Sequence, residues 1–117
     1  MNFFYYYFQL NTAAPKKVRE VSAEATWNAL KVSWEPPVNH ALQYHLTFQC
    51  TVKGDTSPVV KTSIDAKKTS YTFGDLTDTR DVATCEVSIV PENFVGVGPE
   101  SKGIFKTSPL GNQLFKI

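Results

Sequence analysis

The sequence predicts an all-β fold, a sandwich of seven short strands in one domain. Three observations support this. Apolar and polar residues alternate within short runs, which is the period of a strand. Stretches rich in glycine, proline or aspartate separate these runs. From Val18 onward, apolar residues never follow an i, i+3, i+4, i+7 pattern over three turns, so no amphipathic helix is expected.

The clearest strand is predicted at residues 30–35. Leu30, Val32 and Trp34 alternate with polar residues, so their side chains lie on one face of a strand. Two prolines follow directly. Because proline has no backbone N–H for a sheet ladder, the strand is expected to end there.

A second clear strand is predicted at residues 44–50. Tyr44, Leu46, Phe48 and Cys50 occupy alternate positions and therefore share one face. A glycine-containing turn follows, which marks the end of the strand.

Five other strands have weaker or shorter patterns. They are expected at residues 18–23, 58–64, 69–73, 83–90 and 102–107. The strand at 58–64 is expected at a sheet edge, and the strand at 83–90 is half-buried and ends at a proline. The apolar side chains expected in the core are Leu30, Val32, Trp34, Tyr44, Leu46, Phe48, Tyr71, Phe73, Leu76, Val87 and Ile89.

Composition is that of an ordinary globular protein. The 117 residues are 42% hydrophobic and 20% charged, enough apolar surface for one core and too much for a disordered chain. The net charge of +1 gives no broad positive field for phosphate backbones, so nucleic acid is not expected as a partner. The apolar stretch within residues 1–10 is too short to span a bilayer, so no membrane insertion is expected.

Four segments, taken in order, resemble the fibronectin type III family. Residues 30–37 resemble its second strand, with the core tryptophan and the prolines that follow, and residues 44–48 resemble its third. Residues 69–76 are similar to the fifth strand and the leucine after it, and residues 93–101 to the loop between the last two strands. The resemblance implies a seven-stranded immunoglobulin-like β-sandwich of the fibronectin type III type.

The resemblance defines the expected domain limits. It covers residues 15–109, which leaves residues 110–117 as a C-terminal tail and residues 1–14 as an unassigned N-terminal extension. Three interpretations of the extension stay open: a secretion signal, a remnant of a longer reading frame, or an additional strand.

One departure from the family concerns its sixth strand. Cys85 stands where the family usually has a tyrosine whose hydroxyl ties the preceding crossover to the backbone. In the family's fold the third and sixth strands are antiparallel neighbours, which implies that Cys50 and Cys85 lie close enough to form a disulfide. The alternative is two separate buried thiols, since free cysteine behaves as a small hydrophobe.

The sequence contains no clear catalytic or metal-binding pattern. A serine or cysteine nucleophile needs a histidine and an orienting acid, but only His40 and His45 are present, without a G-x-S-x-G turn. The acids Asp75, Asp78 and Asp81 share one connection and are expected to be solvated. No enzymatic activity, cofactor or metal site is therefore expected.

Two segments are candidate contact sites. Asn93, Phe94, Val95 and Val97 are expected at the tip of the last loop, where apolar side chains on a rigid scaffold make contacts; the alternative is that Phe94 folds onto the sandwich. The tripeptide of Lys53, Gly54 and Asp55 resembles the basic-Gly-Asp sequences that some integrins recognise, although any turn can contain these residues.

The resulting functional expectation is a non-catalytic binding or adhesion module of an extracellular or cell-surface protein, monomeric in isolation, with a protein partner. Two alternatives stay open. One is a spacer domain of an intracellular muscle-type or cytoskeletal protein, and the other is an accessory domain of a larger enzyme such as a receptor-type phosphatase. The redox state of Cys50 and Cys85 distinguishes the compartments, because disulfides persist in oxidising ones.

Overall fold

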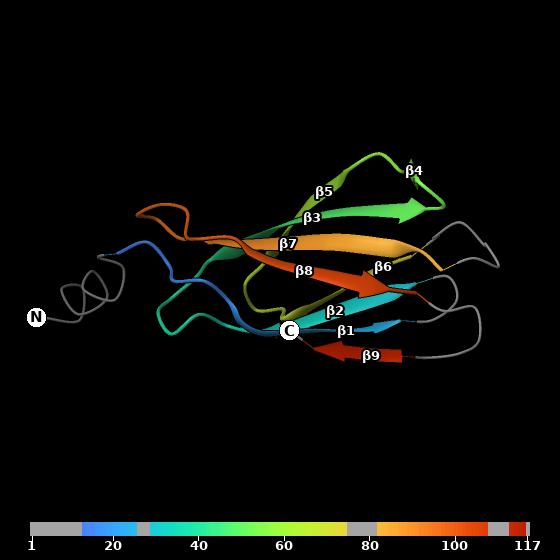
Figure 1. Ribbon diagram of the computed structural model, residues 1–117. Coiled ribbons are helices and arrows are strands. Elements are labelled where there is room, and N and C mark those ends of the chain that lie inside the picture. Colours follow the sequence, from blue (N-terminus) through green and yellow to red (C-terminus); the bar gives the residue numbers. More distant parts are fainter. Residues whose placement is uncertain (1–12, 26–28, 75–81, 108–112, 117) are drawn as a thin grey trace, which may run out of the picture.

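A computed structural model describes residues 13–25, 29–74, 82–107 and 113–116. They form two antiparallel sheets packed face to face (Figure 1). The strands are β1 (Arg19–Ala25), β2 (Leu30–Glu35), β3 (Gln43–Val52), β4 (Asp55–Thr56), β5 (Val60–Asp65), β6 (Ser70–Phe73), β7 (Thr84–Glu92), β8 (Ser101–Lys106) and β9 (Gln113–Lys116).

The two sheets have different strand orders. One sheet runs β6-β2-β1-β9, and the other runs β4-β3-β7-β8 with β5 also pairing with β3. The described part of the chain therefore has the all-β sandwich that the sequence predicts. Seven of its strands lie at the predicted positions, and β4 and β9 are additional. The predicted end of one strand was wrong, because β7 continues through Pro91 to Glu92 and both residues keep their register with β3. β9 lies within residues 110–117, the expected tail, and pairs with β1.

The core lies between the sheets, and β2 and β3 show most clearly how it is formed, because their side chains alternately face the core and the outside. In β2 the burial alternates at every residue, and β3 follows the same period over eight positions. The expected core side chains that are buried are Leu30, Val32, Trp34, Tyr44, Leu46, Phe48, Phe73, Val87 and Ile89. Tyr71 is half-buried against them, and Leu76 lies outside the described residues.

Aromatic contacts join the two sheets across this core. Trp34 of β2 packs edge-to-face on Tyr44 of β3, with ring centroids 5.3 Å apart. Phe73 of β6 stacks on Phe48 of β3, with centroids 4.1 Å apart. Such pairs stabilise a fold beyond the area that they bury. Burial raises the pKa of the Tyr44 hydroxyl.

The Trp34 indole nitrogen is an exception in this core. Among the described residues it is the buried side-chain polar atom without a hydrogen-bond partner. An unsatisfied buried N–H costs free energy, so the apolar packing of the ring must outweigh it. The tryptophan is therefore held by its shape and its contacts with the core.

Candidate functional site

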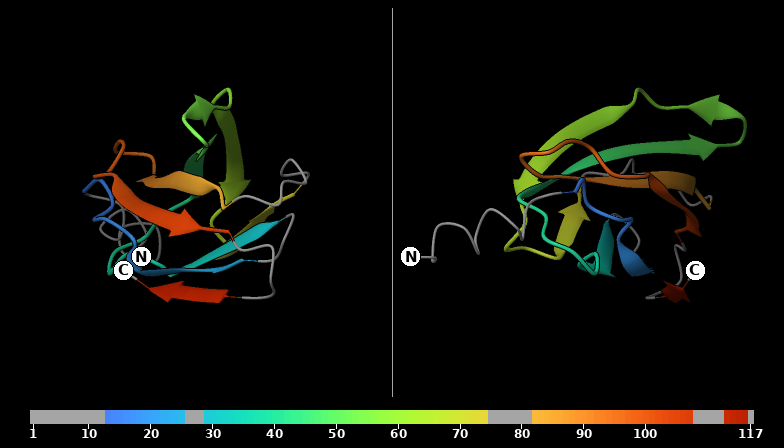
Figure 2. Two further views of the ribbon diagram at one scale, coloured as in Figure 1. Left: turned by 45° about the vertical axis from the view of Figure 1, so that its right-hand side comes forward. Right: turned by 90° about the vertical axis from the view of Figure 1, so that its left-hand side faces the viewer.

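The loop between β7 and β8, residues 93–100, lies at one end of the sandwich. Residues 13–16 and the 36–42 connection lie at the same end (Figures 1 and 2). Asn93 joins the three segments: its Nδ2 donates to the carbonyl oxygens of Ala13 at 2.8 Å and His40 at 3.0 Å. The Asn93 side chain is only 5% exposed, so this predicted contact residue is a structural link.

The same asparagine also shapes the loop tip. Its Oδ1 accepts hydrogen bonds from the backbone N–H groups of Val95 at 2.8 Å and Gly96 at 3.2 Å. Its own backbone N–H donates to the Gly96 carbonyl, and Glu92 and Val97 form a β-bridge at the base. These bonds satisfy the polar groups of the turn internally, so the tip has a defined conformation.

Gly98 fixes the other side of the loop. Its N–H donates to the Pro91 carbonyl at 2.8 Å. A Cβ atom at this position would lie 2.2 Å from the backbone oxygen of Pro15. Only glycine permits this approach, which holds the N-terminal segment against the loop.

The apolar side chains of the tip point into solvent. Phe94 is 73% exposed, Val95 50% and Val97 57%. Phe94 therefore does not fold onto the sandwich. In the neighbouring connection Val38 is also exposed, so apolar groups occur on two adjacent loops. An exposed aromatic residue on a fixed loop is typical of a contact site.

An open hollow lies beside these loops. It has a volume of about 490 Å³ and is lined by residues 36–42, Tyr44 and residues 65–67. A second asparagine links the 36–42 connection to the N-terminal segment. Asn39 Nδ2 donates to the Ala14 carbonyl at 2.9 Å, and its Oδ1 accepts from the Lys16 N–H. The pattern of apolar residues contains no signal for these asparagine links, because they act on backbone groups far away in sequence.

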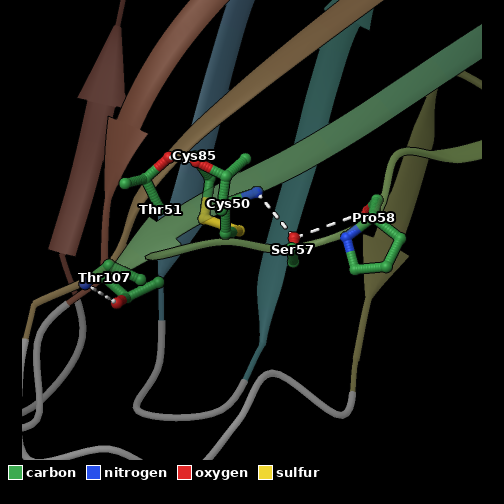
Figure 3. The surroundings of a disulfide bond; sticks show 8 residues. Cys50, Thr51, Ser57, Pro58, Cys85 and Thr107 are labelled. Atoms are coloured by element: carbon green, nitrogen blue, oxygen red, sulfur yellow. Dashed lines mark hydrogen bonds between the residues drawn. A yellow bond between two sulfur atoms is a disulfide. The ribbon is translucent and has the colours of Figure 1, made fainter. Parts of the chain in front are cut away.

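Cys50 and Cys85 form a disulfide between β3 and β7 (Figure 3). The two residues are direct partners in the β3–β7 register. The backbone N–H of Cys50 donates to Ser57 Oγ, and its carbonyl accepts from the Ser57 N–H. Because both backbone groups of Cys50 point away from β7, the cysteines form a non-hydrogen-bonded pair, the closer type of cross-strand pair.

Lys53 and Gly54 form the two-residue turn between β3 and β4, at the opposite end from the 93–100 loop (Figure 1). Both have positive φ, 51° and 86°. This is the geometry of a type I′ hairpin, in which the second position favours glycine. Lys53, Gly54 and Asp55 are all exposed. The conformation explains the glycine, and the lysine and aspartate flank it at a protruding tip.

A row of polar side chains crosses the outer face of the β5–β3–β7 sheet. His45 Nε2 lies 2.6 Å from Glu92 Oε1, and His45 Nδ1 lies 2.7 Å from Ser63 Oγ. Gln43 donates a further bond to the same Glu92 oxygen. The hydrogen bond from His45 lowers the pKa of Glu92, and partial burial opposes this. Sequence reasoning did not connect Ser63 or Glu92 with His45.

This row has the connectivity of a serine–histidine–acid relay, but its setting differs. A hydrolase also needs donors that stabilise an oxyanion and a cleft that holds substrate. Ser63, His45 and Glu92 lie on an open sheet face, and none of them lines the hollow beside the loops. The row is therefore best described as a surface hydrogen-bond chain that links three strands.

Neither a metal site nor a membrane-spanning helix occurs in the described residues. No group of three or more histidine, cysteine or acidic side chains there could hold a metal ion. That part of the chain also contains no helix able to span a bilayer. Asp75, Asp78 and Asp81 lie outside the described residues, so their predicted solvation is not tested.

Comparison with solved structures shows which known fold this is. A domain of human collagen XX matches with a TM-score of 0.62 and 22% identity, covering 82% of this chain and 100% of that domain. The FN5 domain of Drosophila Lar matches with a TM-score of 0.58 and 22% identity, covering 80% and 97%. The chain has the fibronectin type III fold.

A redesigned β-sandwich protein is also similar to this fibronectin type III fold, with a TM-score of 0.66, 24% identity and coverage of 81% and 97%. No family model matches the sequence, and no curated protein matches it. The chain therefore shares the fold of these structures at low sequence identity. Domains of this fold are typically binding or spacer modules, and the surface decides which of these a domain is.

Proposed function

We propose that this fibronectin type III domain is a non-catalytic protein-binding module of an extracellular or cell-surface protein, and that Phe94, Val95 and Val97 form its contact site. The observation that carries the proposal is the combination of high exposure with a fixed backbone. A rigid loop loses little conformational entropy on binding, and aromatic anchors contribute most to interface energies.

The disulfide supports an extracellular location. Disulfides persist in oxidising compartments and are rare in the reducing cytosol. Cys85 is fully buried and Cys50 nearly so, which protects the bridge from reductants. In the reducing cytosol the two cysteines would pack as free thiols without a cross-link, so a formed bridge favours the cell-surface module over the cytoskeletal alternative.

The test uses the folded domain as a fluorescent tetramer on intact cells of the source organism. The wild-type tetramer should bind to the cells. The apparent affinity of the Phe94→Ser/Val97→Ser variant should be at least tenfold lower, because this variant lacks two of the exposed apolar side chains. Ile104→Ser is the matched control, since Ile104 is 65% exposed on β8, away from the loop.

The control should bind like wild type, and all three proteins should melt at similar temperatures. Equal binding by the loop variant would reject the loop as the contact site. Absence of any binding by the wild type would instead favour a spacer role.

The Lys53–Asp55 hairpin is a second candidate, favoured by its position at an exposed tip. It would present a carboxylate and a cation to an integrin. A Lys53→Ala/Asp55→Ala variant keeps Gly54 and therefore the turn. If the candidate is correct, cells should attach to wild-type-coated surfaces and fail to attach to this variant, and unchanged attachment would reject it.

A further inference from the structure

β5 is the edge strand of its sheet, and it has no described strand on its outer side. Among the described strands it pairs with β3 alone, in an unbroken register from Gln43–Asp65 to Phe48–Val60. Figures 1 and 2 show it at the margin of the sandwich. No proline or bulge interrupts residues 60–65. The backbone groups of such an edge strand are a template for pairing with another strand whose charges complement its own.

The direction of the β3 backbone shows which β5 groups are unpaired. Cys50 directs its N–H and carbonyl toward Ser57, on the side of β3 where β5 also pairs. Because this direction alternates along a strand, Leu46 and the other even-numbered residues of β3 use their groups to bond β5. Their partners on β5 are also even-numbered. Lys61, Ser63 and Asp65 therefore direct their backbone groups toward the open edge.

These three residues also share the outer face of the sheet. Lys61 and Asp65 lie two positions on either side of Ser63, carry opposite charges and are exposed. Among the described residues, neither forms an ion pair within the domain. In an antiparallel copy of this strand, a lysine would lie opposite an aspartate at both ends. The edge is thus self-complementary in charge.

We propose that two copies of this domain associate through antiparallel pairing of their β5 strands, about a two-fold axis at Ser63. In this register Ser63 lies opposite Ser63 of the second copy, and Lys61 lies opposite its Asp65. Both Ser63 residues exchange backbone hydrogen bonds, and each Asp65 N–H donates to a Lys61 carbonyl. The Asp65 carbonyl already accepts from the Lys68 N–H, so four intermolecular backbone bonds are expected.

The pairing also covers apolar side chains on the inner face. Thr62 would lie opposite Ile64 of the second copy, and Val60 opposite its Ala66. Val60 is now about half-exposed, and Ile64 and Ala66 are half-buried against the core. One strand pair buries less area than a standard stable interface, so the dimer should be weak and dependent on concentration. Many copies on one surface would strengthen it by avidity.

The test is sedimentation velocity of the oxidised domain from micromolar to millimolar concentration. The wild type should shift reversibly toward twice its monomer mass and shift less at high salt, because the charges at the edge are screened. Lys61→Asp and Asp65→Lys should each remain monomeric, since like charges then face each other twice. An equimolar mixture of these two variants should form a heterodimer, and the double variant should recover self-association.

Lys106→Asp is the control, because Lys106 is an exposed lysine on β8, at the other margin of the sheet. It should associate like wild type. A wild type that is monomeric at every concentration overturns the proposal, as does self-association that survives Lys61→Asp. Self-association lost in Phe94→Ser and retained in Lys61→Asp would assign the contact to the loop. The dimer does not depend on the loop's proposed function, so either can fail alone.

Discussion

Two single residues, Trp34 and Gly98, are important for the stability of this fold. Trp34 fills the space between the sheets, and Gly98 lets the N-terminal segment approach the β7–β8 loop. The first was predicted from its place in an apolar run. The second was recognisable only as a turn glycine, because a close approach between distant segments leaves no local sequence signal.

Trp34→Ala should destabilise the domain by about 3 to 5 kcal/mol, because the substitution removes a large buried side chain and leaves a cavity. Urea unfolding followed by intrinsic fluorescence or circular dichroism measures this. Trp34→Phe is the milder comparison, since it keeps an aromatic ring and removes the unpartnered N–H. A near-wild-type midpoint for Trp34→Ala would contradict the core assignment.

Gly98→Ala should destabilise by about 1 to 3 kcal/mol, the usual range for a forced steric clash. The added methyl would meet the Pro15 oxygen, which is backbone and cannot rotate away. The matched control is Gly74→Ala, where a Cβ atom meets nothing within 4 Å. Thermal melts of both variants test the prediction, which fails if the two lose stability equally.

At the scale of elements, β3 and β7 form the centre of the molecule. They are joined by nine register pairs, by the disulfide and by the His45–Glu92 contact. The strand positions were predictable because burial repeats at every second residue. The polar row on the outer face was not, because its members are brought together only by the register of three strands.

The Cys50→Ala/Cys85→Ala variant should remain folded but lose up to about 4 kcal/mol, the chain-entropy value for a loop of this length. The sequence separation of the two cysteines is 35 residues. Denaturant unfolding of the variant, and of wild type with reductant, should give similar losses. Recovery of two alkylatable thiols from protein made in an oxidising host would show that the bridge does not form.

Glu92 should make stability depend on pH. Its pKa is lower in the folded state than its ordinary value of 4.5, mainly through the hydrogen bond from His45. The unfolded chain therefore binds the proton more readily, and the stabilising contribution is present above pH 4.5 and disappears as pH falls through the folded pKa.

Glu92→Gln removes this contribution. Wild type should be the more stable protein at neutral pH, and the two urea midpoints should converge in acid. If the difference between the two urea midpoints stays constant from neutral pH to pH 3, the Glu92 carboxylate is excluded as the cause of that difference. Because the His45 and Glu92 side chains are partly exposed, the difference between the two urea midpoints should also decrease with added salt.

At the scale of the whole molecule, one end is assembled from three distant segments. Asn93 and Asn39 bind the carbonyls of Ala13 and Ala14, so residues outside the sandwich strands shape the loop. Periodicity and turn residues allowed the all-β fold to be predicted, and the family resemblance placed the loop after β7, but the exposure of Phe94 stayed open until the structure was known. The sequence did not allow the role of Asn93 to be predicted, because an asparagine in a loop can equally face solvent or link backbones.

A domain that begins at Pro15 should keep its core but lose order in the loop. Without Ala13 and Ala14, two side-chain amides lose acceptors, and the backbone N–H of Gly96 should exchange with deuterium faster. A domain that begins at Ala13 is the control. Hydrogen exchange by mass spectrometry should show faster exchange at residues 93–98 only in the shorter protein, with β3 and β7 unchanged in both.

The link between the two central strands also sets how far the chain can extend under mechanical load. Cys50 and Cys85 are 35 positions apart in the sequence, and an extended chain spans about 3.4 Å per position, so the bridge prevents about 120 Å of the chain from extending. When such a domain is unfolded by force, only the segments before Cys50 and after Cys85 can extend. A protein containing it would therefore lengthen in short steps while oxidised and in longer steps after reduction.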